Sequence, residues 1–335
     1  MKLFRPIRRR AFGTALLNRS LTLLARQARA FKRALKPAVS RPHRSPAVAG
    51  KGWTQGVASG AAGSRRYWLY CPPGVAAQER LPLMVMLHGC RQDAAAFAAS
   101  TGMNRVALRE RFLVLYPEQD LSANAQGCWN WFETDSGRGF GEAELILGAI
   151  DQVCARQPVD PQRVAISGLS AGASMAALLV TRHPARFQAL VMHSGIPPGT
   201  AHSTMSALGA MQHHHATRPL AVTSAVMAAS WPALLVIHGQ ADRVVSPRYG
   251  QASADLWAAA AGASPAAARR LQRGRRHAMS ITDFKHVGRT VATLVAVDKL
   301  GHAWSGGADR QPFADAAGPD ASRMAWSFAA KQFLP

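Results

Sequence analysis

Residues Val164 to Met175 read VAISGLSAGASM and place a serine where a strand passes directly into a helix. The segment VAI is apolar and partly β-branched, as in a buried strand, whereas AGASMAALLV (171–180) consists of small and apolar helix formers. Between them, GLSAG matches the nucleophile elbow GxSxG, in which glycines allow a tight turn and the serine hydroxyl projects from the sheet. The five letters alone also fit a glycine-rich turn, so Ser170 is a candidate nucleophile because of its position between strand and helix.

A serine nucleophile needs a base to take its proton, and the base needs an acid to fix its tautomer. Enzymes whose nucleophile lies on a GxSxG elbow present serine, acid and histidine in that order along the chain. The apolar run PALLVIH (232–238) is followed by Asp242, and VATLVAV (291–297) is followed by His302. We therefore expect Asp242 as the acid and His302 as the base, each on a loop after a strand. Two other carboxylates are alternatives for the acid: Asp298 and Asp309.

Acyl transfer also requires an oxyanion hole, because negative charge develops on the former carbonyl oxygen. One backbone N–H is expected from the residue after the nucleophile, Ala171, and the other from the loop after an early strand. The apolar run LMVML (83–87) predicts that strand and leads into His88, Gly89 and Cys90. We expect Cys90 to supply the second N–H.

The rest of the chain alternates strand and helix signals, which predicts one α/β domain. With 48% hydrophobic residues, 335 residues can bury one sizeable core. Strands are predicted at 66–70, 83–87, 112–116, 163–166, 189–193, 233–238 and 290–297. Helices are predicted at 94–111, 142–156, 171–182, 247–261 and 321–333.

Longer stretches carry a more specific signal than the elbow. They are LMVMLHGCRQDAAAFAASTGMNRVA (83–107), FLVLYPEQ (112–119), CWNWF (128–132), GLSAGASM, VIHGQADRVV and the closing GHAW. In these stretches the chain resembles the polyhydroxybutyrate depolymerase-type esterases of the α/β-hydrolase superfamily. The pairing of HGC with CWNWF about forty residues later is the most specific part. Ala173, where many members have glycine, is a small departure.

The resemblance implies an α/β-hydrolase fold, in which helices flank a mostly parallel central sheet. It implies that Ser170, Asp242 and His302 form a catalytic triad that needs neither a metal nor an organic cofactor. It also suggests a disulfide between Cys90 and Cys128, which would stiffen the oxyanion loop. Buried, reduced cysteines, as in a cytoplasmic protein, are the alternative.

By resemblance the substrate is a hydroxyalkanoate polyester or its oligomers, cleaved through an acyl-enzyme. Feruloyl or acetyl esters of plant polysaccharide are the alternative, because related esterases use the same catalytic parts. Three tryptophans adjoin the expected catalytic loops, and contact with an apolar substrate and packing in the core are equally consistent with their positions: Trp129, Trp131 and Trp304.

The formal net charge of +22 is concentrated near the N-terminus, because residues 1–78 hold 16 Lys and Arg and no Asp or Glu. Within 1–36, leucines and arginines recur at helical spacing and predict a basic amphipathic helix. We assign residues 1–63 to this segment and a Pro-, Gly-, Ser- and Ala-rich linker, and 64–335 to the catalytic domain. The segment fits a solvated extension, attachment to an anionic membrane or polyester granule, or a targeting peptide.

The resemblance suggests an extracellular or periplasmic protein, whereas the lack of a clean signal-peptide pattern leaves a cytoplasmic or granule-associated one as the alternative. From another functional class, the basic leader is consistent with a surface- or nucleic-acid-binding protein that keeps a residual hydrolase fold. A nucleic-acid partner is not expected, because the basic runs are not interleaved with stacking aromatic residues.

Overall fold

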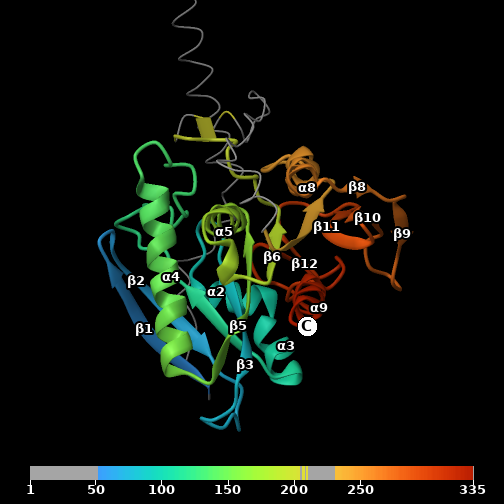
Figure 1. Ribbon diagram of the computed structural model, residues 1–335. Coiled ribbons are helices and arrows are strands. Elements are labelled where there is room, and N and C mark those ends of the chain that lie inside the picture. Colours follow the sequence, from blue (N-terminus) through green and yellow to red (C-terminus); the bar gives the residue numbers. More distant parts are fainter. Residues whose placement is uncertain (1–51, 204–205, 208, 210–230, 335) are drawn as a thin grey trace, which may run out of the picture. The chain divides into compact units, whose positions relative to one another are not determined.

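The computed structural model describes residues 52–203, 206–207, 209 and 231–334. The predicted basic amphipathic segment lies outside the described residues. The described strands form an eleven-stranded sheet in the order β1-β2-β4-β3-β5-β6-β7-β11-β10-β8, and β9 pairs with β10 (Figure 1). The strands are β1 (Trp53–Gly60), β2 (Gly63–Tyr70), β3 (Leu81–Leu87), β4 (Leu113–Pro117), β5 (Val159–Leu169), β6 (Ala189–His193), β7 (Ala233–Gly239), β8 (Ser264–Pro265), β9 (Arg269–Leu271), β10 (Met279–His286) and β11 (Arg289–Val297).

The centre of the sheet is parallel. Strands β4, β3, β5, β6, β7 and β11 run in one direction, whereas β1, β2 and β10 pair antiparallel at the two sides. Because the carboxyl ends of parallel strands meet at one edge, the loops after β3, β5, β7 and β11 gather there. The fold class predicted from the sequence is confirmed.

Helices cover both faces of this sheet, as Figure 1 shows. Side chains of β3 alternate between two cores: Leu83, Val85 and Leu87 enter one, and Met84 and Met86 enter the other. The first core is closed by α4 (Arg138–Arg156), α5 (Ala171–Arg182) and α8 (Arg248–Ala261), and the second by α2 (Ala94–Thr101), α3 (Met103–Glu110) and α9 (Ala321–Gln332). A short 3-10 helix, Pro184–Arg186, and a small pair of strands, β12 (Trp304–Ser305) and β13 (Ala314–Asp315), complete the described elements.

Two expectations about the elements are wrong. The helix predicted at 94–111 is two helices, because Gly102 adopts the left-handed conformation (φ 63°) and serves as the C-cap of α2 and the N-cap of α3. The stretch expected as a linker up to residue 63 contains β1, which pairs with β2 along its whole length. The folded domain therefore begins before residue 64.

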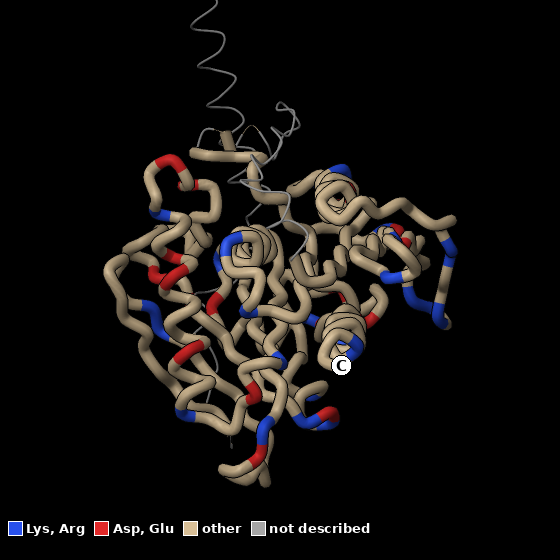
Figure 2. The backbone as a smooth tube through the Cα atoms, in the orientation of Figure 1, with Lys and Arg blue, Asp and Glu red and all other residues tan. Residues whose placement is uncertain are grey.

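Most charged residues of the described chain lie on the surface, and Arg65, Glu142 and Asp242 are buried exceptions. Figure 2 shows basic residues gathered at the β9 side of the sheet, where Arg269 and Arg270 pair with Asp283 and Asp298. Among the described residues, no helix combines the length and apolar character needed to cross a membrane.

Candidate active site

Ser170 occupies the turn between β5 and α5 with φ 56° and ψ −121°, a conformation that L-residues rarely adopt. The glycines on either side are needed for close packing. A Cβ at Gly168 would lie 2.4 Å from the carbonyl carbon of Gly172, and a Cβ at Gly172 would lie 2.1 Å from the carbonyl oxygen of Leu87. The turn can therefore form only with glycine at both positions, and it presents the hydroxyl at the carboxyl edge of the sheet.

The structure brings Ser170, His302 and Asp242 into one hydrogen-bonded chain. His302 Nε2 lies 2.9 Å from Ser170 Oγ, and His302 Nδ1 lies 2.8 Å from Asp242 Oδ2. Since an ionised carboxylate can only accept, Nδ1 carries the proton and Nε2 is left to accept from the serine. The order is that of an activated nucleophile, a base and an orienting acid.

Asp242 is held rigidly on the loop after β7. Its Oδ1 accepts hydrogen bonds of 2.9 Å from the backbone N–H groups of Val244 and Val245, and its side chain is fully buried. A Cβ at Gly239 would lie 2.2 Å from the carbonyl oxygen of Leu300, so glycine lets this loop approach the His302 loop. Burial opposes ionisation of Asp242, but the interactions with His238 and His302 outweigh it and lower its pKa.

The alternatives for the acid lie elsewhere. Asp298 forms an ion pair with Arg270, and the side chain of Asp309 is 82% exposed. Neither is hydrogen-bonded to His302 in the described part of the chain.

Two histidines that the sequence analysis did not single out lie beneath this site. His193 accepts from the Ser305 N–H at 3.1 Å and stacks on Trp304, and burial, with His238 and His302 nearby, lowers its pKa to about 3. His238 Nε2 lies 3.0 Å from the Val245 carbonyl oxygen and 3.6 Å from Asp242 Oδ2. Both histidines lie at the carboxyl ends of predicted strands, β6 and β7, and this position in the sequence could have indicated that they lie near the site.

The two expected oxyanion donors lie close to Ser170. Ala171 is the first residue of α5, so its N–H has no acceptor within the helix. Cys90 follows β3, and a Cβ at the preceding Gly89 would lie 3.5 Å from the carbonyl oxygen of Leu169, the residue before the nucleophile. Their assignment as donors to the oxyanion remains a proposal.

The tryptophans lie in the core. Trp129 and Trp304 are fully buried, and their indole N–H groups donate to the His88 carbonyl oxygen and to Ser322 Oγ. Trp131 is 6% exposed and packs in the same core as Trp129. Of the two alternatives for Trp129 and Trp304, the structure supports packing in the core, where both rings are hydrogen-bonded.

Cys90 and Cys128 form a disulfide, whereas Cys71 and Cys154 are free. The disulfide joins two residues that are 38 positions apart in the sequence. It thereby links the proposed oxyanion loop to the CWNWF segment. In the described part of the chain, no three His, Cys, Asp or Glu residues are grouped so that they could hold a metal ion.

Removing this disulfide should weaken both the fold and the site. We expect the double variant Cys90→Ser, Cys128→Ser to lose about 2–4 kcal/mol of unfolding free energy, because the unfolded chain is no longer cross-linked. Urea denaturation of this variant is compared with that of Cys71→Ser, Cys154→Ser, which keeps the disulfide. Equal losses in the two variants would contradict a stabilising role for the bond.

Comparison with known proteins gives a consistent picture. The family model described as "Esterase PHB depolymerase" matches residues 65–277. Poly(3-hydroxyalkanoate) depolymerase C from Paucimonas lemoignei is 34% identical over 192 residues, which are 55% of this chain and 46% of that protein. Acetylxylan esterase A from Emericella nidulans is 26% identical over 210 residues, 58% of this chain and 67% of that protein. The chain thus spans less than half of the depolymerase.

Among solved structures, an acetyl xylan esterase from Aspergillus awamori has a TM-score of 0.62 at 17% identity, covering 74% of this chain and 94% of that one. An S-formylglutathione hydrolase from Agrobacterium tumefaciens has a TM-score of 0.51 at 14% identity, covering 83% and 92%. At these identities the likeness concerns the fold alone.

Proposed function

We propose, since the chain belongs to the PHB depolymerase family of esterases, that it hydrolyses carboxylic esters through an acyl-enzyme on Ser170. The observation that carries this proposal is the pair of hydrogen bonds at His302, 2.9 Å to Ser170 Oγ and 2.8 Å to Asp242 Oδ2. It supplies a nucleophile, a base and an acid in the geometry that acyl transfer needs.

The reaction has two halves. Ser170 Oγ attacks the ester carbonyl carbon while its proton passes to His302 Nε2, and the tetrahedral intermediate then expels the alcohol, which takes that proton. A water molecule next gives a proton to His302 and attacks the acyl carbon. The carboxylic acid leaves, and Ser170 Oγ recovers its proton from His302.

The surrounding residues lower the activation barriers of acylation and of deacylation. The backbone N–H groups of Ala171 and Cys90 stabilise the negative charge on the carbonyl oxygen of each intermediate. The lowered pKa of Asp242 keeps its carboxylate ionised at acidic pH. The carboxylate therefore stabilises the His302 imidazolium that forms during acylation and again during deacylation. The low pKa of His193 keeps this buried neighbour neutral, so it adds no competing positive charge.

For the substrate we propose a hydroxyalkanoate polyester or its oligomers. The family match and the 34% identity to a poly(3-hydroxyalkanoate) depolymerase favour it. Acetyl esters of xylan are the second candidate, favoured by the acetylxylan esterases at 24–26% identity.

The substrate proposal is tested by direct comparison. The purified protein is given amorphous polyhydroxybutyrate, acetylated xylan and a feruloyl ester, and released hydroxybutyrate, acetate and ferulate are quantified. We expect hydroxybutyrate and its oligomers to be released fastest. Faster release of acetate or ferulate would replace the polyester with a polysaccharide ester as the substrate.

A further inference from the structure

We propose that Glu142, a residue of α4, is a positioning residue for the oxyanion hole. Its carboxylate holds Gln119 and the CWNWF segment, which are linked to the Cys90 loop by a hydrogen bond and by the disulfide, and thereby fixes the N–H of Cys90. The proposal rests on the proposed ester hydrolysis and adds to it a residue that does not touch the substrate.

Glu142 collects an unusual number of donors for a buried side chain. It is 2% exposed, and Gln119 Nε2 lies 2.9 Å from each of its carboxylate oxygens. Asn130 donates to it twice, through the backbone N–H at 2.9 Å and through Nδ2 at 2.6 Å. Arg65 Nη2 completes the set at 3.1 Å. Only a carboxylate accepts at all of these points, because an amide would turn one oxygen into a donor.

These contacts lead to Cys90 by two routes. Gln119 Nε2 also donates to the Cys128 carbonyl oxygen at 3.0 Å, and Cys128 is covalently joined to Cys90. The Gln119 backbone N–H donates to His88 Nε2 at 3.1 Å, two residues before Cys90. The second route is reinforced by Trp129, which follows Cys128 and donates to the His88 carbonyl oxygen at 3.1 Å.

Glu142 thus anchors the oxyanion loop from both sides. Because Cys90 is two residues from His88 and is covalently joined to Cys128, a shift of Gln119 or of the CWNWF segment would move its N–H. A misplacement of about 1 Å in a catalytic group can cost about a hundredfold in rate. We therefore expect Glu142 to affect kcat, through stabilisation of the charged intermediate, more than KM.

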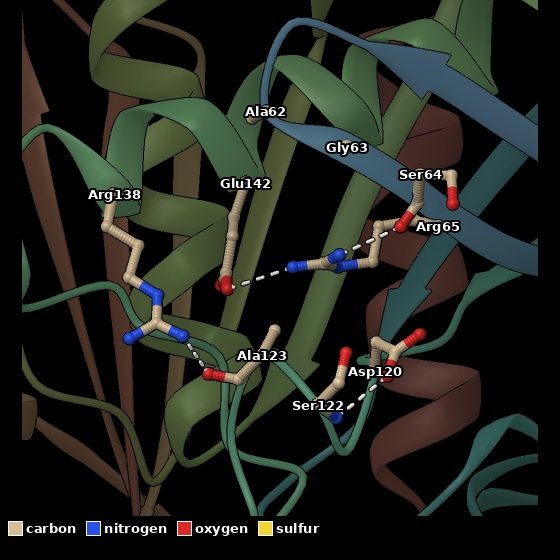
Figure 3. Close-up of a pocket in the computed structure, with 9 residues that line it drawn as sticks. All are labelled: Ala62, Gly63, Ser64, Arg65, Asp120, Ser122, Ala123, Arg138 and Glu142. Atoms are coloured by element: carbon tan, nitrogen blue, oxygen red, sulfur yellow. Dashed lines mark hydrogen bonds and ion pairs between the residues drawn. The ribbon is translucent and has the colours of Figure 1, made fainter.

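The carboxylate also borders a cavity of about 290 Å³ between the β1–β2 hairpin and the loop after β4. In Figure 3 the Glu142 side chain points toward Arg65, and Arg138 reaches toward the Ala123 carbonyl oxygen. Arg65 is 7% exposed, and its buried Nε lacks a hydrogen-bond partner among the described residues. A small anion can therefore enter beside Arg65 when the carboxylate is removed.

The test uses the full chain, p-nitrophenyl butyrate and an alkyl boronic acid, which forms a charged tetrahedral adduct with a serine. We expect Glu142→Gln to lower kcat by about 10–100-fold, to change KM by less than about threefold and to weaken boronate affinity by the same factor as kcat. Added formate should restore part of the kcat of Glu142→Ala. The matched control is Glu144→Gln on the same helix, whose side chain is 56% exposed and pairs with His183. It should behave as wild type.

If the Glu142 variants do not fold, Gln119→Met removes the side-chain amide that joins Glu142 to Cys128, and it should lower kcat in the same way. A folded Glu142→Gln variant with wild-type kcat would overturn the inference, as would a loss of kcat without loss of boronate affinity. Wild-type protein without turnover would overturn the proposed function and this inference together. Wild-type turnover with an unaffected variant would overturn the inference alone.

Discussion

Ser170→Ala should lower kcat for p-nitrophenyl butyrate by about a millionfold, which is the loss that removal of a triad nucleophile causes in serine hydrolases. Without Oγ no acyl-enzyme can form, and His302 is left with no hydroxyl to deprotonate. The remaining rate would come from direct attack of water on an ester held by the oxyanion donors. Active-site titration should find no burst of p-nitrophenol.

Ser167, on the strand that leads into the nucleophile, provides a matched control. Its hydroxyl is buried and has no hydrogen-bond partner among the described residues, so Ser167→Ala removes the same atom without breaking an interaction. This variant should keep wild-type kcat, since loss of an unpartnered hydroxyl is close to neutral. Equal activity of Ser170→Ala and Ser167→Ala would refute the acyl-enzyme mechanism.

Asp242→Asn should lower kcat by about ten-thousandfold while leaving the fold intact. The backbone N–H groups of Val244 and Val245 will retain the amide oxygen at the Oδ1 position, which turns the amide NH₂ toward His302. Nδ1 must then accept, so the imidazole proton moves to Nε2. In that tautomer Nε2 cannot take the proton of Ser170.

The measurement is kcat for p-nitrophenyl butyrate with Asp242→Asn and Asp298→Asn, and circular dichroism checks that both variants are folded. Asp298, one of the two alternative acids, follows the predicted last strand, and its ion pair with Arg270 is partly exposed. Its variant should keep wild-type kinetics. A folded Asp242→Asn variant with more than about one tenth of wild-type activity would assign the orienting role to another group.

The positions of the catalytic residues could be predicted because the sequence shows where the buried strands end. Buried parallel strands appear as continuous apolar runs, and a nucleophile, an acid and a base after three such runs meet at one edge of the sheet. For this reason β6 and α5 match their predicted bounds, and Ser170, Asp242 and His302 lie together. The N–H donors follow from the same topology, although their role in catalysis remains a prediction.

The sequence analysis missed strands whose residues are not typical of a buried strand, namely β1 and β10. The glycines and small residues of β1 resemble a linker, but a Cβ at Gly56 would lie 2.2 Å from the ring of Tyr67. Glycine is present there to make room for an aromatic side chain across the strand pair. The polar residues of β10 obscure its strand pattern because only Met279 and Phe284 of this strand are buried.

The buried contacts of Glu142 could not be read from the sequence either. A glutamate in an amphipathic helix normally faces water, and nothing in its spacing indicates that Gln119 and Asn130 will meet it. The sequence left substrate contact and core packing open for Trp129 and Trp304 for a related reason. Proximity along the chain to a catalytic residue does not determine whether a side chain points toward the ligand or into the core.

The arginines at the β9 side of the sheet have a consequence for solubility. An open strand edge can recruit strands from other molecules and start aggregation. Strand β10 is followed outward only by β8 and β9, of two and three residues, and Arg269 and Arg270 on β9 are largely exposed. Very short edge strands with charged, exposed side chains are poor templates for pairing with another copy of the same edge. The chain can therefore end its large sheet in water without inviting polymerisation.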